Sequence, residues 1–257
     1  MQSEAQKVMS KSEIHVLPDP DALAQEAGRR FIASASAAIS ASGQFNVVLA
    51  GGSTPAGLYR LLAQAPCRDK VDWSRTFVYF GDERCVPPDH PDSNYRMARE
   101  TLLDHVPLPS ANIFRMPGEL DPVAAAAIYA AVLRQDFRTH GLGRPRFDLI
   151  LLGMGADGHT ASLFPGMPAL GERWRLVTAT AVPADVHPAV PRITLTLPVL
   201  NAGREVLFLG AGANKAEAVR AVLAGPKPAE PLPARRVRPR TGTLTWLLDE
   251  AAAAGLG

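Results

Sequence analysis

Two residues able to do acid–base chemistry lie close together past the middle of this 257-residue chain. Residues 151–166 read LLGMGADGHTASLFPG, so an apolar stretch gives way to glycines and then to Asp157 and His159. In an extended backbone, residues two apart direct their side chains to the same side. A carboxylate beside an imidazole sets the tautomer of the ring and raises its basicity, as a general base requires. We therefore predict that Asp157 and His159 are catalytic; the alternative is a histidine that only caps the following helix.

A second segment has the composition of an anion-binding turn. Gly51, Gly52, Ser53 and Thr54 follow an apolar stretch and precede a helical pattern. Glycines allow close approach of the backbone, the hydroxyls can donate hydrogen bonds, and a helix N-terminus presents free N–H groups. The segment is neither a Walker loop nor a G-x-G-x-x-G dinucleotide loop. We predict that it binds substrate, with an ordinary capped turn as the alternative.

Four charged residues are further candidates. Asp82 and Arg84 directly follow the apolar residues 76–80, and the Arg84 guanidinium has the planar fork that suits phosphate or carboxylate. Arg192 begins the sequence RITLT, and Lys215 follows two glycines at a predicted strand-to-helix turn. Each could be an ordinary surface charge. We predict that these four residues bind the substrate.

These residues must be positioned by the predicted strands and helices. We expect strands at residues 14–17, 45–50, 76–80, 112–116, 147–153, 176–180, 193–197, 206–209 and 244–248. We expect helices from Asp19 or Asp21 to about Gly43, over 55–65 with Thr54 as N-cap and Pro55 first, over 93–106 capped by Ser93, over 121–140, from near Asn214, and after the last strand. The alternation predicts an α/β fold with a doubly wound, mostly parallel sheet and helices on both faces. Ligands of such sheets bind at the carboxyl ends of the strands, where the candidate residues lie.

Composition limits the classes of function. The net charge of +2 is too small for bulk attraction to nucleic acid or membrane, and we expect neither as a partner. We interpret the basic run ARRVRPR at 234–240 as a solvated edge. Cys67 and Cys85 fit neither a disulfide scaffold nor a metal site, so no metal is expected. The polar N-terminus and the absence of a long apolar stretch predict a cytoplasmic location.

The chain is expected to form one α/β domain over residues 13–257, preceded by a flexible N-terminal segment, 1–12. The proline-rich stretch at 224–234 is interpreted as a surface crossing and not as a domain boundary. We expect a monomer, or at most a weak dimer.

The motifs GGSTP, GDERCVPPDHPDSNYRMA, FDLILLGMGADGHTASLFPG, PRITLT and GANK, in this order, resemble the 6-phosphogluconolactonase family within the sugar-phosphate isomerase superfamily. The resemblance extends from about residue 14 to 254. It implies a cytoplasmic, metal-independent hydrolase of 6-phospho-D-glucono-1,5-lactone in the pentose phosphate pathway. It also implies the Rossmann-like doubly wound fold, no cofactor, and a small sugar-phosphate lactone as the partner.

The resemblance further implies roles for the candidate residues. His159 would activate a water molecule that attacks the C1 carbonyl, while Asp157 orients the imidazole, and His159 would then protonate the departing ring oxygen. Arg84, Arg192 and Lys215 would bind the phosphate and the developing oxyanion, with Arg192 and Lys215 favoured near the phosphate.

No acyl-enzyme is expected, because Ser53 and Ser162 have no evident adjacent base in the sequence. Two other functions remain as alternatives. One is an amino-sugar-phosphate isomerase or deaminase, a family in which a Glu follows the loop histidine by five residues; this chain has Phe164 there. The other is a non-catalytic sugar-phosphate-sensing domain, for which the dozen residues before the first strand are too few to form a helix-turn-helix.

Overall fold

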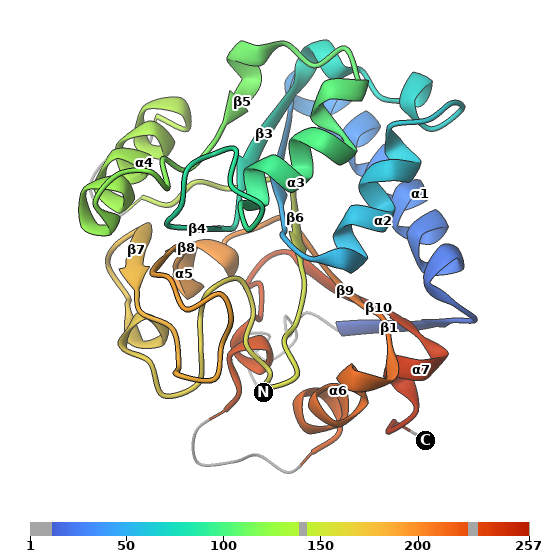
Figure 1. Cartoon of the computed structure of the whole chain (residues 1–257). Coiled ribbons are helices and arrows are strands. Elements are labelled where there is room, and N and C mark those ends of the chain that lie inside the picture. Colours follow the sequence, from blue (N-terminus) through green and yellow to red (C-terminus); the bar gives the residue numbers. More distant parts are fainter. Residues whose placement is uncertain (1–11, 139–142, 226–230, 257) are drawn as a thin grey trace, which may run out of the picture.

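The main sheet is the scaffold of the protein. The structure is a computed structural model that describes residues 12–138, 143–225 and 231–256. Seven parallel strands form the main sheet in the order β1-β10-β9-β6-β2-β3-β5 (Figure 1). Their bounds are β1 Ser12–Leu17, β2 Phe45–Leu49, β3 Thr76–Phe80, β5 Ile113–Phe114, β6 Leu149–Leu152, β9 Glu205–Gly210 and β10 Thr243–Asp249. Strands β2 and β6 are buried along their whole length, as expected for the centre of a sheet covered on both faces. The predicted fold class is confirmed.

A second, antiparallel sheet of three strands lies beside the first. Its order is β4 (Asp82–Arg84), β8 (Arg192–Leu195) and β7 (Val177–Thr180). The predicted strands at 176–180 and 193–197 therefore do not join the parallel sheet. Only a loop connects β7 to β8, and neighbouring parallel strands need a crossover that is usually helical, so the two strands pair antiparallel. The charged sequence after β3 becomes a strand of this sheet.

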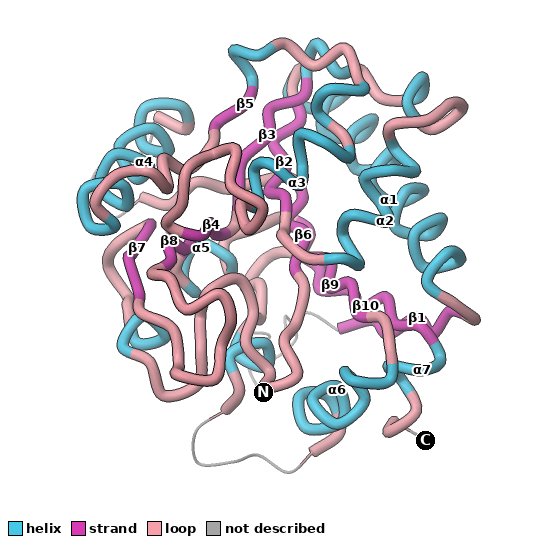
Figure 2. Tube along the Cα trace, viewed as in Figure 1, coloured by secondary structure: helices cyan, strands magenta, loops and turns pink. Residues whose placement is uncertain are grey.

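Helices cover the main sheet on both sides. In the views of Figures 1 and 2, α1 and α2 lie to the right of the sheet, whereas α4 and the small sheet lie to the left. The helices are α1 Pro20–Ser42, α2 Ser53–Leu62, α3 Asn94–Thr101, α4 Pro122–Asp136, α5 Leu197–Leu200, α6 Ala216–Leu223 and α7 Glu250–Ala253. None of these helices combines the length and apolar character that crossing a bilayer requires, within the described residues.

Capping residues explain several helix ends. Asp19, the first of the two predicted caps, accepts the N–H of Ala22, and Ser93 accepts the N–H of Arg96. The prediction for α2 was wrong: the N-cap is Gly52, so Thr54 lies inside the first turn. Gly52 has φ 103°, a conformation that only glycine adopts readily, and the helix begins at Ser53, two residues before the predicted first residue, Pro55.

Three further boundaries differ from the predictions. Helix α3 ends at Thr101 because Leu102 leaves the helical conformation (φ −140°), and a 3₁₀ turn follows. Helix α4 ends at Asp136, and part of its predicted extension to 140 lies outside the described residues. A 3₁₀ turn, Ala213–Lys215, precedes α6.

The predicted N-terminal segment 1–12 is one residue too long, since Ser12 already belongs to β1 and pairs with β10. Residues 1–11 lie outside the described residues. Residues 226–230 of the proline-rich stretch also lie outside the described residues.

The direction of winding reverses between β2 and β6. From β2 the chain proceeds through β3 to β5 at one edge of the sheet, and from β6 it proceeds through β9 to β10 on the other side. The loops that follow β2 and β6 consequently diverge and leave a crevice at the carboxyl ends of the two central strands. This switch point is where ligands of doubly wound sheets bind.

Candidate active site

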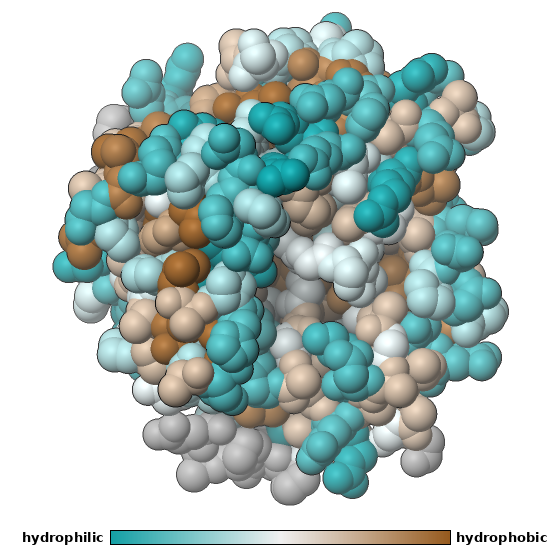
Figure 3. Space-filling model, viewed as in Figure 1, coloured by the Kyte–Doolittle hydropathy of each residue, from teal (hydrophilic) through white to brown (hydrophobic). Residues whose placement is uncertain are grey.

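A cavity of about 240 Å³ opens at this switch point. The hollow in the middle of the face shown in Figure 3 lies over the same region, between the small sheet and α2. All predicted site residues except Asp157 line the cavity: Gly51, Gly52, Ser53, Thr54, Asp82, Arg84, His159, Arg192 and Lys215. Asp157 contacts one of these residues, His159, directly. Five separate segments of the chain thus meet at one place.

Asp157 and His159 form a close pair. Asp157 Oδ1 lies 2.6 Å from His159 Nδ1, and it also accepts the His159 backbone N–H at 3.1 Å. The predicted contact is present, but its predicted cause was wrong, because the segment is a turn and not extended. The Gly158 N–H closes this turn by donating to the Gly155 carbonyl at 3.0 Å. With Nδ1 donating to the carboxylate, the lone pair of the ring is on Nε2 and can accept a proton.

The imidazole is confined by its neighbours. A Cβ atom at Gly155 would overlap His159 Nδ1 and Asp157 Oδ1, so only glycine permits the pair at this distance. The ring of Phe164 lies against the imidazole with 4.7 Å between the centroids. Thr160 donates its hydroxyl to the Gly153 carbonyl at 2.9 Å. These contacts hold the ring in one orientation.

The pair also determines the charge of Asp157. Partial burial opposes ionisation of this carboxyl group, but the hydrogen bond and charge of His159 outweigh burial and hold the pKa of Asp157 below its usual value. A lowered carboxyl pKa contributes stability above the ordinary Asp value of about 3.9, and this contribution is lost only as the pH falls through the lowered value. Asp157 is therefore an anion throughout the neutral range.

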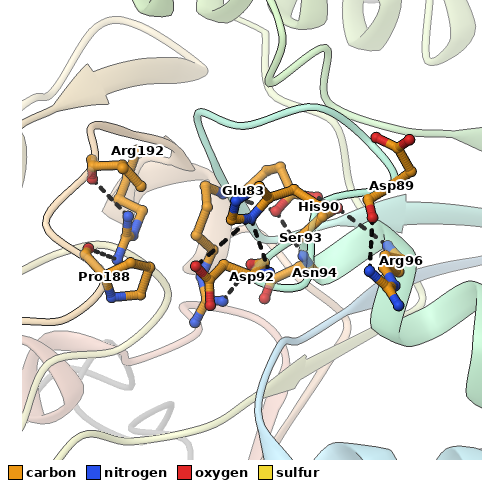
Figure 4. A network of polar contacts seen from close by, with 11 residues as sticks. Glu83, Asp89, His90, Asp92, Ser93, Asn94, Arg96, Pro188 and Arg192 are labelled. Carbon is orange, nitrogen blue, oxygen red and sulfur yellow. Dashed lines mark hydrogen bonds and ion pairs between the residues drawn. The ribbon is translucent and has the colours of Figure 1, made fainter.

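Arg84 and Arg192 lie directly opposite each other on β4 and β8. Arg84 Nη1 donates to the Asp92 carbonyl at 2.6 Å, and Arg192 donates to the carbonyls of Val190 and Pro188 at 2.6 and 2.8 Å (Figure 4). Burial and the neighbouring Arg84 charge lower the pKa of Arg192. Like charges opposite one another destabilise a strand pair. The arrangement thus favours an anion between or beside the two guanidinium groups.

Asp82 is held by two polar residues that sequence reasoning did not assign. Its Oδ2 accepts the Ser162 hydroxyl at 2.6 Å, and Asn94 Nδ2 donates to its backbone carbonyl at 2.9 Å. The expectation that Ser162 has no adjacent base was therefore wrong: a carboxylate from β4, 80 residues away in the chain, contacts it. No pattern of local spacing could reveal this contact. Ser162 itself is 1% exposed.

Glu83, also unassigned by the sequence, binds the small sheet to α3. Its carboxylate accepts the backbone N–H groups of Arg84, Asn94 and Tyr95 at 2.7–2.8 Å and the Ser93 hydroxyl at 3.1 Å (Figure 4). Burial raises the pKa of Glu83, and the backbone N–H donors act in the opposite direction. The acidic residue at the centre of the DER sequence is thus structural, and it positions Asp82 and Arg84 on either side.

The opposite rim of the cavity carries the remaining cation. Lys215 lies at the turn between β9 and α6, and its ammonium group has no hydrogen-bond or ion-pair partner within the described part of the chain. The turn is held by Asp249, which accepts the Gly212 N–H through both oxygens. Ser53 and Thr54 lie in the first turn of α2 beside the cavity.

Neither a metal-binding cluster nor a disulfide is found among the described residues. Among the described residues, no three His, Cys, Asp or Glu side chains gather as a metal site would require. Cys67 and Cys85 are free thiols.

Comparison with known proteins agrees with the fold. The model of the family described as glucosamine-6-phosphate isomerases/6-phosphogluconolactonase matches residues 18–246, and the chain belongs to this family. Within the family, it is 42% identical to 6-phosphogluconolactonase from Nostoc sp. over 247 residues, 96% of this chain and 99% of that protein. It is also 42% identical to 6-phosphogluconolactonase from Mycobacterium tuberculosis over 253 residues, covering 95% of this chain and 98% of that protein.

Solved structures show the same fold. 6-Phosphogluconolactonase from Trypanosoma cruzi superposes with a TM-score of 0.86 at 30% identity, covering 98% of this chain and 99% of that one. A monomeric glucosamine-6-phosphate deaminase superposes with a TM-score of 0.79 over 95% of this chain and 99% of that one. At 22% identity, this second likeness concerns the fold alone.

The Glu83 network generates a stability prediction. Glu83→Gln places an NH₂ group against backbone N–H donors, so at least one buried hydrogen bond is lost. We expect the free energy of unfolding, measured with urea, to fall by about 1–3 kcal/mol. The matched control is Glu100→Gln on the exposed side of α3, where loss of the ion pair with Arg96 should change stability by about 0.5 kcal/mol or less. Equal stabilities of the two variants would show that Glu83 is protonated in the folded protein.

Proposed function

We propose that the protein hydrolyses 6-phospho-D-glucono-1,5-lactone to 6-phospho-D-gluconate, as the names of its relatives indicate for those proteins. The observation that carries this proposal is the Asp157–His159 pair: Asp157 Oδ1 lies 2.6 Å from His159 Nδ1, and His159 lines a cavity that three cations also line. A base and a separate set of cations are what hydrolysis of an anionic lactone needs. The protein would act in the pentose phosphate pathway, in the cytoplasm, with no cofactor.

The first step is attack of water on the lactone. His159 Nε2 accepts a proton from a water molecule while the oxygen forms a bond to C1 of the lactone. Asp157 holds the Nδ1 proton and stabilises the imidazolium by its negative charge, for which its lowered pKa keeps it ionised. The second step breaks the bond between C1 and the ring oxygen, and the imidazolium returns its proton to that oxygen.

The phosphate supplies most of the affinity in this proposal. Arg192 and Lys215 bind it together with the N–H groups at the start of α2 and the hydroxyls of Ser53 and Thr54. Arg84, opposite Arg192, contributes positive charge to the phosphate or to the oxyanion that forms at C1.

One contact disfavours the amino-sugar-phosphate isomerase alternative. The position five residues after His159 holds Phe164, which is 2% exposed and packs on the imidazole. An apolar ring here offers no second carboxylate for opening an amino-sugar ring.

The direct test is hydrolysis of freshly made 6-phosphogluconolactone, followed by proton release and corrected for spontaneous ring opening. We expect catalysed turnover with this substrate and no ammonia release from glucosamine 6-phosphate. The reverse result would replace the lactonase assignment by the isomerase alternative, and tight binding of 6-phosphogluconate without turnover of either substrate would favour the sensing domain.

His159→Asn should fold normally, bind 6-phosphogluconate almost as tightly as the unmodified protein, and lose at least about two orders of magnitude in kcat, because a general base contributes about a hundredfold or more. Asp157→Asn should change kcat in the same direction. His105→Asn, which alters an exposed histidine on the 3₁₀ turn after α3, is the matched control. A native kcat for His159→Asn would remove His159 from the mechanism.

Removal of the phosphate group from the substrate should also lower the catalytic efficiency strongly. We expect kcat/KM for unphosphorylated glucono-1,5-lactone to be at least about a hundredfold lower, since charge-assisted hydrogen bonds contribute about 1.5–3 kcal/mol each. Arg192→Gln and Lys215→Ala should mainly raise KM, as loss of uniform binding does. A Lys215→Ala protein with reduced kcat and unchanged KM would place Lys215 at the oxyanion instead.

Ser162→Ala distinguishes the water mechanism from a serine nucleophile. The Ser162 hydroxyl is buried and donates to Asp82, so we interpret it as a positioning group. Its removal should lower kcat by about tenfold or less, whereas loss of a serine nucleophile costs several orders of magnitude. Rapid-quench detection of an acyl-enzyme in the unmodified protein would contradict the water mechanism.

A further inference from the structure

A second cavity lies at the C-terminal end of α6, whereas the candidate active site lies at the start of this helix. Its volume is about 420 Å³, within the range of small-molecule sites in proteins. Leu223 at the end of α6 and Leu244 near the start of β10 contribute apolar surface, and Arg235, Arg238 and Arg240 contribute charge. The active-site cavity is formed at the opposite ends of the strands, where Lys215 precedes α6. The two cavities are therefore distinct.

The basic run ARRVRPR accounts for this charge. The expectation of a solvated edge was wrong in part, because Ala234 and Val237 of this run are each 1% exposed. Burial of these two side chains fixes the backbone, and Arg235, Arg238 and Arg240 of the run line the cavity. No acidic residue is found among the described residues of the lining, and neither Arg238 nor Arg240 forms an ion pair within the described residues.

An unpaired donor in the wall is the independent observation. Trp246 is 2% exposed and stacks on Phe208 with 3.9 Å between the ring centroids. Its indole Nε1 is buried and has no hydrogen-bond partner in the part of the chain that the structure describes. Buried donors are almost always paired, and an unpaired one calls for an explanation. An acceptor brought by a bound molecule would supply the missing partner.

We propose that this cavity binds a small organic phosphate with an apolar body. The guanidinium groups of Arg238 and Arg240 would bind the phosphate oxygens, for which their planar forks are suited. The apolar body would lie against Leu223 and Leu244, and a phosphate or ester oxygen would accept the Trp246 N–H. Nothing in this arrangement depends on the reaction proposed for the first cavity.

Two contacts connect the second cavity to the catalytic loop. The Ala234 N–H, at the start of the basic run, donates to the Gly158 carbonyl at 3.0 Å, and Gly158 lies between Asp157 and His159. Arg235 Nη1 donates to the Ala221 carbonyl of α6 at 3.2 Å, and α6 begins directly after Lys215. A ligand that orders the basic run would therefore also restrain the catalytic turn.

The test uses 1-naphthyl phosphate as probe, with inorganic phosphate and 1-naphthol as the charged and apolar parts alone, in isothermal titration calorimetry. We expect naphthyl phosphate to bind more tightly than either part. The double variant R238Q/R240Q should weaken binding by at least about tenfold, as loss of charge-assisted hydrogen bonds does, and Trp246→Phe should weaken it severalfold. Arg134→Gln on the exposed face of α4 is the matched control and should bind as the unmodified protein does.

Three outcomes would overturn the proposal: no binding at millimolar probe, binding unaffected by R238Q/R240Q, or binding lost in Lys215→Ala, which would place the probe in the first cavity. Circular dichroism and the Tm of each variant establish that it is folded. Hydrogen exchange of the amides at 155–160 should slow when the probe binds, and unchanged exchange would contradict the connection to the catalytic loop.

Discussion

The rest of the structure depends on β2 and β6, the two neighbouring central strands whose following connections lead to opposite sides of the main sheet. Both strands are completely buried, run in the same direction, and lead to connections that turn away from each other. No connection can then cover the carboxyl ends of the two strands, and a crevice is left between loops that the core holds rigidly. The Gly51–Thr54 turn follows one strand and the Asp157–His159 turn follows the other, so their separation is set by the spacing of hydrogen-bonded strands.

Two like charges, those of Arg84 and Arg192, lie opposite each other at this crevice, which destabilises the strand pair. Hydrogen bonds within and beside the small sheet compensate for this repulsion. Arg84 and Arg192 face each other with the pKa of Arg192 lowered by burial and by its neighbour, an arrangement that would not persist without restraint. Backbone carbonyls of Asp92, Val190 and Pro188 accept the guanidinium N–H groups. Glu83 anchors the strand that carries Arg84 to the start of α3. The polar contacts in Figure 4 thus hold the two guanidinium groups in fixed positions.

The turn that carries Asp157 and His159 is held by contacts from several parts of the chain. Gly155 lets Asp157 approach the imidazole, Phe164 packs on the ring, and the contact between Gly158 and Ala234 joins the turn to the basic run near the C-terminus. The turn that holds His159 therefore contacts Ala234, one of the residues that line the second cavity. This contact couples the position of His159 to the packing of the basic run.

The strands, the helices and the polar segments that follow the strands could be predicted from the sequence alone. Periodicity and capping residues identified the alternating strands and helices, and the GGST, DER, GADGH and GANK segments were recognisable because each places unusual residues where a strand ends. The sequence also determined that Asp157 and His159 would lie close together, since only Gly158 stands between them. Contacts between distant segments were decided only by the tertiary structure: the Arg84–Arg192 opposition, the Ser162–Asp82 hydrogen bond and the small antiparallel sheet. The physical reason is that periodicity and capping act over a few residues, whereas these contacts depend on how strands far apart in the chain are brought into register by the packing of the whole core.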